Sequence, residues 1–292
     1  MRALVVGGGT MAAGIAACLA AAGLDTVVQV RRASVVDGVR AEIARRGAGR
    51  PVSVVAGEPG GPFTLAVESI AEDAGAKRDV LARAEALVAE DGIVTTNTSS
   101  LRLADLAGGL ARPERFAGWH WFNPAELVPL VEVVGGPRTA PETLEHLTAL
   151  SERIGKRPVT VRRDVPGFVA NRLQYALLRE AYALVEAGIC TVADVDRAVV
   201  DGLGARWAAI GPFATMDAAG LDVHEAVVEQ LFPVLSRRTD VPGLLRQARD
   251  RGESGMRGGA GLRGAYGPDA VRELTHRRDT ILALLNEKEG PR

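Results

Sequence analysis

Residues 7–12, with the sequence GGGTMA, constrain the fold of this chain more than any other segment. They follow a short apolar run at residues 3–6, which is typical of a buried parallel strand. They precede an alanine-rich stretch at residues 11–22, which predicts a helix that ends near Gly23, and a second apolar run at residues 26–30. A strand, a glycine turn, a helix and a strand within about 30 residues predict a βαβ unit.

A glycine turn between a strand and a helix suits the pyrophosphate of a dinucleotide. The first glycine allows the tight turn, and the second lets the backbone approach the pyrophosphate, which rests on the unpaired N–H groups of the helix. The third small residue is Ala12, where the helix packs on the strand. We therefore expect the cofactor to contact Gly7, Gly9, Thr10 and Met11.

The end of the second strand bears on the choice between NAD and NADP. An acidic residue there would bind the ribose 2′-hydroxyl of NAD, but this chain has Val30 or Arg31 at that position and Arg32 next. We expect either NAD or NADP as the cofactor. Two guanidinium groups would pair well with the 2′-phosphate of NADP, so the arginines favour NADP. As solvated surface charges, the same arginines would leave NAD as the cofactor.

Apolar runs alternate with helical patterns as far as residue 161. Strands are expected at residues 65–67, 93–96, 130–134 and 158–161, and helices at residues 73–89 and 143–154. This alternation predicts an α/β domain with a mostly parallel, Rossmann-type sheet that has helices on both faces. From Pro166 onward the patterns are helical, at residues 168–185, 192–200, 223–235 and 271–285, and glycine-rich residues 255–267 predict a loop. We therefore expect a dinucleotide-binding domain over residues 1–163 and an all-α domain over residues 164–292.

The composition excludes several classes of function. Lysine and arginine number 35 against 36 acidic residues, so the net charge of −1 gives no electrostatic case for binding nucleic acid or a membrane surface. No apolar stretch is long enough to span a bilayer, and the first residues run into the glycine turn without a signal peptide, so we expect a cytoplasmic protein. Cys18 and Cys190 lie in apolar helical patterns and are expected to be thiols. No metal site is expected.

Polar side chains gather where strands end or helices begin, in residues 68–72 (ESIAE), 97–100 (NTSS), 120–124 (HWFNP) with Glu132 downstream, and 166–172 (PGFVANR). Together with the glycine turn, and with Gly211-Pro212-Phe213, Asp217 and Gly220-Leu221-Asp222, these segments resemble the 3-hydroxyacyl-CoA dehydrogenase family in order and nearly in spacing. The resemblance covers almost the whole chain. It implies a Rossmann domain followed by a helical domain through which members commonly dimerise, so a homodimer is expected.

The resemblance implies a role for each matched residue. His120 matches the general acid/base, and Glu132 matches the carboxylate that orients it. Ser99 and Asn171 match residues that hydrogen-bond around the substrate oxygen and the nicotinamide. Positions on the cofactor side are matched by Glu72, Lys77, Asn97 and Asn123. These residue types suit the chemistry, because oxidation of a secondary alcohol requires a hydride acceptor and a base, and histidine titrates near neutral pH.

One segment departs from the family. Residues 32–67 are too short for the long helical hairpin that in typical members helps to bind the adenine end of coenzyme A, and they predict one helix at residues 35–44. The expected reaction is hydride transfer between NAD(P) and the 3-hydroxy or 3-keto position of a small acyl thioester, carried by CoA or by an acyl carrier protein. A free 3-hydroxy acid, such as a sugar acid of the gulonate type, is the alternative substrate.

Two interpretations compete with this enzyme. A Rossmann scaffold without chemistry would bind the cofactor or pack as a crystallin does, but Ser99, His120, Glu132 and Asn171 are all present, which favours an active oxidoreductase. A dehydrogenase of the 6-phosphogluconate type would need a lysine base in the helical half, and the helix predicted after Pro166 contains no lysine.

Overall fold

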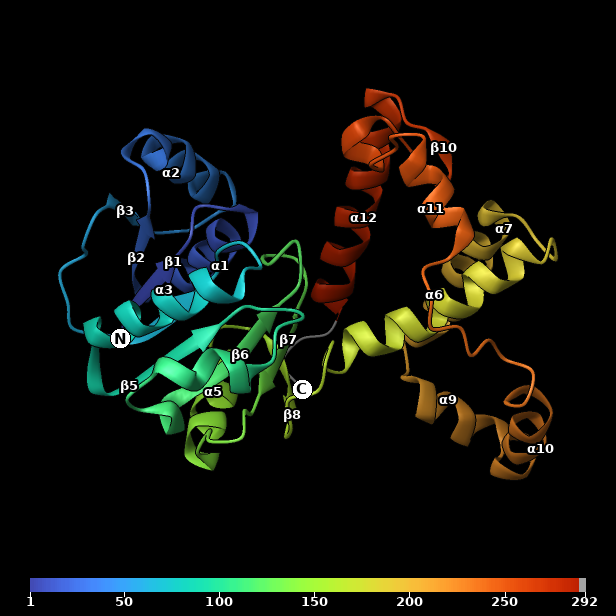
Figure 1. Cartoon of the computed structure of the whole chain (residues 1–292), viewed down its shortest axis with the longest axis horizontal. Helices are drawn as coiled ribbons and strands as arrows, with labels where there is room; N and C mark the ends of the chain where they lie inside the picture. The colour runs from blue at the N-terminus through green and yellow to red at the C-terminus, as the bar shows by residue number, and fades with distance from the viewer. Residues whose placement is uncertain (289–292) are drawn as a thin grey trace. The chain divides into compact units, whose positions relative to one another are not determined.

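The computed structural model describes residues 1–288 and divides the chain into two compact units. The first unit comprises residues 1–172, which run from blue to yellow-green in Figure 1, and the second begins at Leu173. The boundary predicted near residue 163 lies just after the last strand of the sheet. The next turns of chain cluster with the first unit, where the backbone N–H groups of Val169 and Ala170 donate to the carboxylate of Glu132.

An eight-stranded sheet forms the centre of the first unit, with the strand order β3-β2-β1-β4-β5-β6-β7-β8. Its strands are β1 (Arg2–Val6), β2 (Asp25–Val30), β3 (Ser53–Ala56), β4 (Phe63–Glu68), β5 (Val88–Thr96), β6 (Phe116–Trp121), β7 (Leu130–Val134) and β8 (Arg157–Val161). Strands β1 to β6 run parallel, β7 is antiparallel to β6, and β8 is parallel to β7. The predicted mostly parallel sheet is confirmed. The apolar patterns did not indicate β6, because glycine and histidine interrupt its apolar residues.

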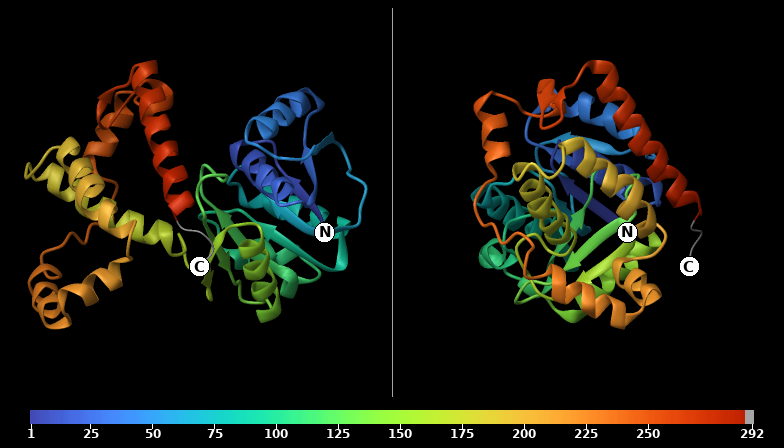
Figure 2. Two further views of the ribbon diagram at one scale, coloured as in Figure 1. Left: turned by 180° about the vertical axis from the view of Figure 1, so that it is seen from behind. Right: turned by 90° about the vertical axis from the view of Figure 1, so that its right-hand side faces the viewer.

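Helices cover both faces of this sheet, as predicted (Figures 1 and 2). They are α1 (Thr10–Ala21), α2 (Val36–Arg45), α3 (Ala74–Leu87), α4 (Leu103–Leu106) and α5 (Pro141–Arg153), with short 3-10 turns η1 (Ala33–Val35), η2 (Ala107–Gly109) and η3 (Pro113–Arg115). Successive strand residues point to opposite faces. Val5 and Val67 therefore share a core with α1, α2 and α5, whereas Leu4 and Ala66 share one with α3 and α4.

The segment between β2 and β4 is as short as its sequence indicated. It contains η1, α2 and β3, and the described chain has no helical hairpin there. The one helix expected at residues 35–44 is observed as α2, with Val39 and Ile43 buried against the sheet.

The second unit is helical, as predicted, apart from one small hairpin. Its elements are α6 (Ala170–Glu186), which begins in the first unit, α7 (Val192–Arg197), a π-helical stretch η4 (Ala198–Gly204), α8 (Ala205–Trp207), α9 (Pro212–Ala219), α10 (Leu221–Leu231), α11 (Gly243–Asp250), η5 (Met256–Gly258), β9 (Ala260–Gly261), β10 (Gly264–Ala265) and α12 (Pro268–Lys288). The β9–β10 hairpin lies in the stretch expected to be a loop. Among the described residues of this unit, only Ala248 and Gly261 are buried. None of the described helices is both long and apolar enough to cross a membrane.

Candidate active site

The carboxyl ends of four neighbouring parallel strands form one edge of the sheet, where open α/β sheets bind ligands. Hydrogen bonds link these strand ends in turn. The N–H of Ser69, after β4, donates to Val6 of β1, and the N–H of Asn97, after β5, donates to Glu68 of β4. The N–H of Trp121 in β6 donates to Oδ1 of Asn97 at 2.8 Å. This chain of bonds places the predicted polar segments side by side.

The glycine turn lies at this edge, between β1 and α1. Gly7 has φ +145°, and a Cβ atom there would lie 2.3 Å from the carbonyl oxygen of Ser69, so the position requires glycine. Gly9 precedes the helix and supplies no side-chain cap. The first N–H groups of α1 are therefore free to bind an anion, which fits the pyrophosphate of a dinucleotide.

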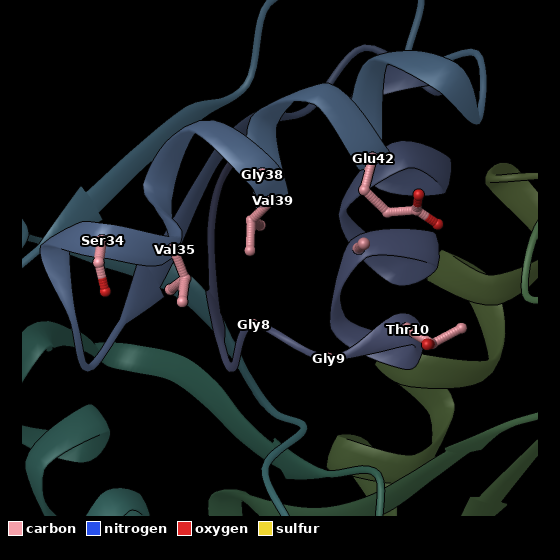
Figure 3. Close-up of a pocket in the computed structure, with 9 residues that line it drawn as sticks. Gly8, Gly9, Thr10, Ser34, Val35, Gly38, Val39 and Glu42 are labelled. Carbon is pink, nitrogen blue, oxygen red and sulfur yellow. The ribbon is translucent and has the colours of Figure 1, made fainter.

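A cavity of about 480 Å³ opens beside this turn, lined by Gly8, Gly9, Thr10, Ala13, Ser34, Val35, Gly38, Val39 and Glu42. Figure 3 shows Val35 and Val39 on the η1–α2 segment facing the space next to the Gly8-Gly9 turn. The combination of apolar walls and open N–H groups fits the adenosine and pyrophosphate of NAD. The sequence indicated Gly9 and Thr10, but it carried no signal for the wall on α2, which tertiary packing brings over the turn.

His120 and Glu132 form a buried pair on adjacent strands. They are direct partners in the antiparallel register of β6 and β7, and Nδ1 of His120 lies 2.7 Å from Oε2 of Glu132. Their side chains are only 6% and 1% exposed. A carboxylate can only accept hydrogen bonds, so Nδ1 carries a proton, and in the neutral imidazole Nε2 is the nitrogen with the lone pair. Because Nε2 bonds to no other described residue, it is available to take a proton from a bound hydroxyl.

The second oxygen of Glu132 is held by the backbone. Its Oε1 accepts hydrogen bonds from the N–H groups of Val169 and Ala170, both at 2.9 Å. Burial raises the pKa of Glu132, but the bonds from His120, Ala170 and Val169 outweigh it and leave the pKa below its ordinary value. Glu132 therefore stays ionised and keeps the imidazole in one tautomer. The sequence could not reveal these two partners, because backbone N–H groups are common to nearly all residue types.

Ser99 lies in a turn that Glu72 organises. Oε1 of Glu72 accepts from the N–H groups of Ser99 and Ser100, both at 3.1 Å, from the Ser100 hydroxyl at 2.9 Å, and from the hydroxyl of Thr98. Burial raises the pKa of Glu72, but the Thr98 hydroxyl, the charge of Lys77 and the Ser100 hydroxyl bring it below its ordinary value. The Ser99 hydroxyl itself bonds to no other described residue, which leaves it available to a ligand.

Lys77 lies beneath this turn. Its side chain is 1% exposed, and its ammonium is 2.7 Å from Oε1 of Glu68 and 3.3 Å from Oε2 of Glu72. Glu68 also accepts from the hydroxyl of Thr96 at 2.5 Å and from the N–H of Ile70 at 2.7 Å. Lys77 was expected on the cofactor side, and the structure places its charge inside an ion-pair network that supports the turn. Glu68 was not assigned a role from sequence, although its position at a strand end nine residues before a lysine was a signal.

The remaining expected site residues occupy several positions. Asn171 lies in the first turn of α6, directly after the two N–H groups that bind Glu132, and its amide bonds to no other described residue. Asn123 lies two residues after the end of β6, before Pro124, and is exposed. Met11, in the first turn of α1, is half-buried and packs against the core. Arg31 and Arg32 follow β2 with exposed side chains that form no bond to another described residue.

A buried arginine joins the wall of the cavity to the turn after β6. Arg46 donates to Oε1 of Glu42, which lines the cavity, at 2.8 Å, and to both oxygens of Glu126 at 2.8 and 2.7 Å. Its side chain is 10% exposed. Gly14 of α1 lies against this cluster, because a Cβ atom there would be 2.9 Å from that of Ala125. The helix of the glycine turn, the cavity wall and the segment after His120 are thus held together.

Comparisons with known proteins identify the family of this chain. The family profile described as "3-hydroxyacyl-CoA dehydrogenase, NAD binding domain" matches residues 62–165, and the one described as "3-hydroxyacyl-CoA dehydrogenase, C-terminal domain" matches residues 167–263. The 5-formyl-3-hydroxy-2-methylpyridine 4-carboxylate 5-dehydrogenase of Mesorhizobium japonicum is 35% identical over 98% of this chain and 97% of its own length.

Solved structures give the same result. A structure described as this pyridine-carboxylic acid 5-dehydrogenase, "an NAD+ dependent dismutase", has a TM-score of 0.91, with 33% identity over 97% of this chain and 96% of that one. The (S)-3-hydroxybutyryl-CoA dehydrogenase from Ralstonia eutropha has a TM-score of 0.72, with 28% identity over 91% of this chain and 99% of that one. The chain belongs to the 3-hydroxyacyl-CoA dehydrogenase family of NAD-dependent oxidoreductases.

Proposed function

We propose that this protein transfers a hydride between NAD and the alcohol or carbonyl carbon of a small free acid, with His120 as the general acid/base. The observation that carries the proposal is the buried pair of His120 and Glu132, in which Nδ1 is bonded to the carboxylate at 2.7 Å and Nε2 is free. A histidine held in this way takes a proton at Nε2 and returns it in the reverse reaction.

The surrounding residues have complementary tasks in the oxidation of an alcohol. NAD held at the start of α1 would supply the acceptor for the hydride of the carbinol carbon. Nε2 of His120 takes the hydroxyl proton, so that a ketone or aldehyde remains. Glu132 stabilises the imidazolium that forms. The unpartnered hydroxyl of Ser99 and amide of Asn171 donate hydrogen bonds to the substrate oxygen as its charge changes. The open N–H groups at the start of α1 would hold the pyrophosphate, and Asn123 would lie on the cofactor side.

A free acid is favoured over a thioester by two observations. Between β2 and β4 the described chain has only η1, α2 and β3, which agrees with the prediction that this segment is too short for the CoA-binding hairpin of typical family members. The relative that matches over nearly the full length of both chains is named for a pyridine carboxylate, and its structural counterpart has a much higher TM-score than the CoA-dependent enzyme. A thioester on CoA or on an acyl carrier protein is the alternative substrate.

Arg31 and Arg32 support a capacity to use NADP. Both side chains are exposed just after β2 and form no bond to another described residue, so they are free to pair with a 2′-phosphate. NAD is the cofactor of the relative described as NAD+ dependent. Comparison of kcat/KM for the two cofactors, in the native protein and in Arg31→Asp, decides the preference. If the ratio of kcat/KM with NADP to kcat/KM with NAD does not fall in the variant, Arg31 does not bind the 2′-phosphate.

A homodimer formed through the second unit is also proposed. Among the described residues of this unit only Ala248 and Gly261 are buried, while Phe213, Phe232 and Val234 are 83%, 64% and 74% exposed. Amphipathic helices without a core expose more apolar surface than a soluble monomer usually carries. A second copy of the chain would cover these faces. Light scattering during size-exclusion chromatography tests this, and a monomer at all concentrations would contradict it.

The decisive experiment is a substrate panel, read by the absorbance of the reduced nicotinamide. Free 3-hydroxy acids, and pyridine carboxylates with a formyl or hydroxymethyl group, are compared with acetoacetyl thioesters of CoA, pantetheine and an acyl carrier protein. We expect turnover of a free acid and loss of most of the rate in His120→Ala. Efficient turnover of thioesters alone would refute the free-acid proposal. A rate that His120→Ala leaves unchanged would refute the role of the histidine.

A further inference from the structure

Phe168 has an unusual backbone conformation beside the catalytic pair. Its φ of +49° is in the left-handed region, and no other residue except glycine has a positive φ between residues 1 and 288. A bulky side chain rarely occurs there, because its Cβ atom approaches the following carbonyl oxygen. The surrounding structure must therefore enforce this conformation, and strained residues of this kind are concentrated at functional sites.

The conformation has a direct consequence for Glu132. Gly167, with φ +79°, and Phe168 form a left-handed turn before α6, and the N–H groups of the next two residues point at Oε1 of Glu132. Two donors at 2.9 Å on one oxygen leave the carboxylate little freedom to rotate. The other oxygen is then fixed opposite Nδ1 of His120. The left-handed turn thus sets the direction of the carboxylate that orients the imidazole.

The side chain of the same residue contacts the imidazole. The Phe168 ring is 1% exposed, and its centroid is 5.6 Å from that of His120, with the planes inclined at 62°. The ring of Phe122 is 4.5 Å from the imidazole and inclined at 60°. Two aromatic rings packed against the imidazole restrict its rotation about χ2. Phe168 therefore contacts His120 through its ring, and its backbone conformation directs the next two N–H groups toward Glu132.

We propose that Phe168 is a positioning residue for proton transfer, which its left-handed backbone and its buried ring achieve together. The proposal rests on the proposed function in one respect, since the proton transfer is that of the His120–Glu132 pair. The competing explanation is that Phe168 only fills the core next to Leu103 and Val134. If Phe168 only fills the core, any apolar side chain of similar volume should preserve the rate. If it is a positioning residue, the rate should also depend on the left-handed backbone conformation.

Leucine and isoleucine provide a matched test of this difference. They are isomers with the same volume and apolar character, but a β-branched residue tolerates a positive φ far less well. Under the proposal, Phe168→Leu keeps the turn and most of kcat, whereas Phe168→Ile distorts it and moves the carboxylate. A misplacement of about 1 Å costs about 100-fold in rate, so we expect kcat of Phe168→Ile to be about 100-fold below that of Phe168→Leu. The Kd for the nucleotide should be the same in both.

A measurement without substrate separates this proposal from the proposed function. The proton that Nδ1 of His120 shares with Glu132 should give a far-downfield proton NMR signal, and the amides of Val169 and Ala170 should be protected from hydrogen exchange. Both signatures should persist in Phe168→Leu and be lost in Phe168→Ile. Equal signatures and equal kcat in the two variants would overturn the proposal, whether or not the native substrate is known.

A third variant covers the case in which Phe168→Ile does not fold. Phe168→Gly adopts a positive φ without strain but has no ring. We expect it to keep the exchange protection of the Ala170 amide, because the turn persists, and to lose the narrow imidazole signal, because no side chain then packs against the imidazole as phenylalanine or leucine would. Loss of the amide protection, or an imidazole signal as sharp as that of the native protein, would contradict the two-part role of Phe168.

Discussion

Replacement of Glu132 by glutamine tests the chemistry of the His120–Glu132 pair, because glutamine has the same size and shape as glutamate but carries no charge. In the native protein the carboxylate accepts three hydrogen bonds, from Nδ1 of His120 and from the N–H groups of Val169 and Ala170. An amide has one accepting oxygen and one donating nitrogen. Its oxygen can therefore accept either from His120 or from the two backbone N–H groups, but not from both. The orientation that glutamine takes determines the outcome.

The backbone decides that orientation. If the amide nitrogen faced Val169 and Ala170, two part-buried N–H groups would lose their acceptor, at a cost of about 1 kcal/mol each, the low end of the range for buried donors. The oxygen therefore stays with the backbone, and the amide nitrogen donates to Nδ1 of His120. The imidazole must then carry its own proton on Nε2, where it can no longer take one from the substrate. A wrong tautomer of this kind lowers kcat by about 10⁴-fold, or about 5 kcal/mol.

The same argument predicts a small effect of Glu132→Gln on stability. Every buried donor keeps a partner, so the free energy of unfolding should fall by only about 1–2 kcal/mol. Glu132→Ala leaves three donors without an acceptor and should cost about 3–5 kcal/mol. The assays are kcat with the best substrate of the panel and urea denaturation of all three proteins. A glutamine variant that keeps kcat within about tenfold of native would refute the tautomer argument.

Three further predictions concern the rest of the first unit. In Gly7→Ala the new Cβ atom would meet the Ser69 carbonyl, so we expect stability to fall by about 1–3 kcal/mol and nucleotide binding to weaken, as measured by denaturation and fluorescence titration. Arg46→Met leaves Glu126 without its partner, and the free energy of unfolding should fall by about 1–3 kcal/mol, with incomplete rescue by lysine, which cannot bind both carboxylate oxygens in the same way. The pKa of Glu72 is below its ordinary value of 4.5, so its bonds stabilise the fold above that pH and are lost as pH falls through the lowered pKa. Glu72→Gln should therefore lose less stability than the native protein on acidification below about pH 4.5, and equal losses in urea denaturation would contradict the role of this carboxylate.

The sequence placed the polar segments of the candidate site at strand ends and at the start of a helix, which is where the structure has them. The glycine turn was recognised because a strand, a helix and a second strand surround it. The register of β6 and β7 brings His120 opposite Glu132, as the resemblance to the family implied. Lys77 was less well predicted, because its charge and its place at a helix start suit solvent equally well. Its burial depends on Glu68 and on the turn after β5, which only the folded chain brings together.

The sequence by itself determined the βαβ unit and the helical second unit, because these follow from apolar periodicity and glycine turns, and it indicated candidate site residues through the resemblance to the family. Tertiary structure alone decided three features: the cavity wall on α2, the N–H groups that hold Glu132, and the left-handed turn at Phe168. These features depend on backbone groups and on segments far apart in the chain. A backbone N–H has no residue identity to read, and its direction is set only when the sheet and the start of α6 have packed together.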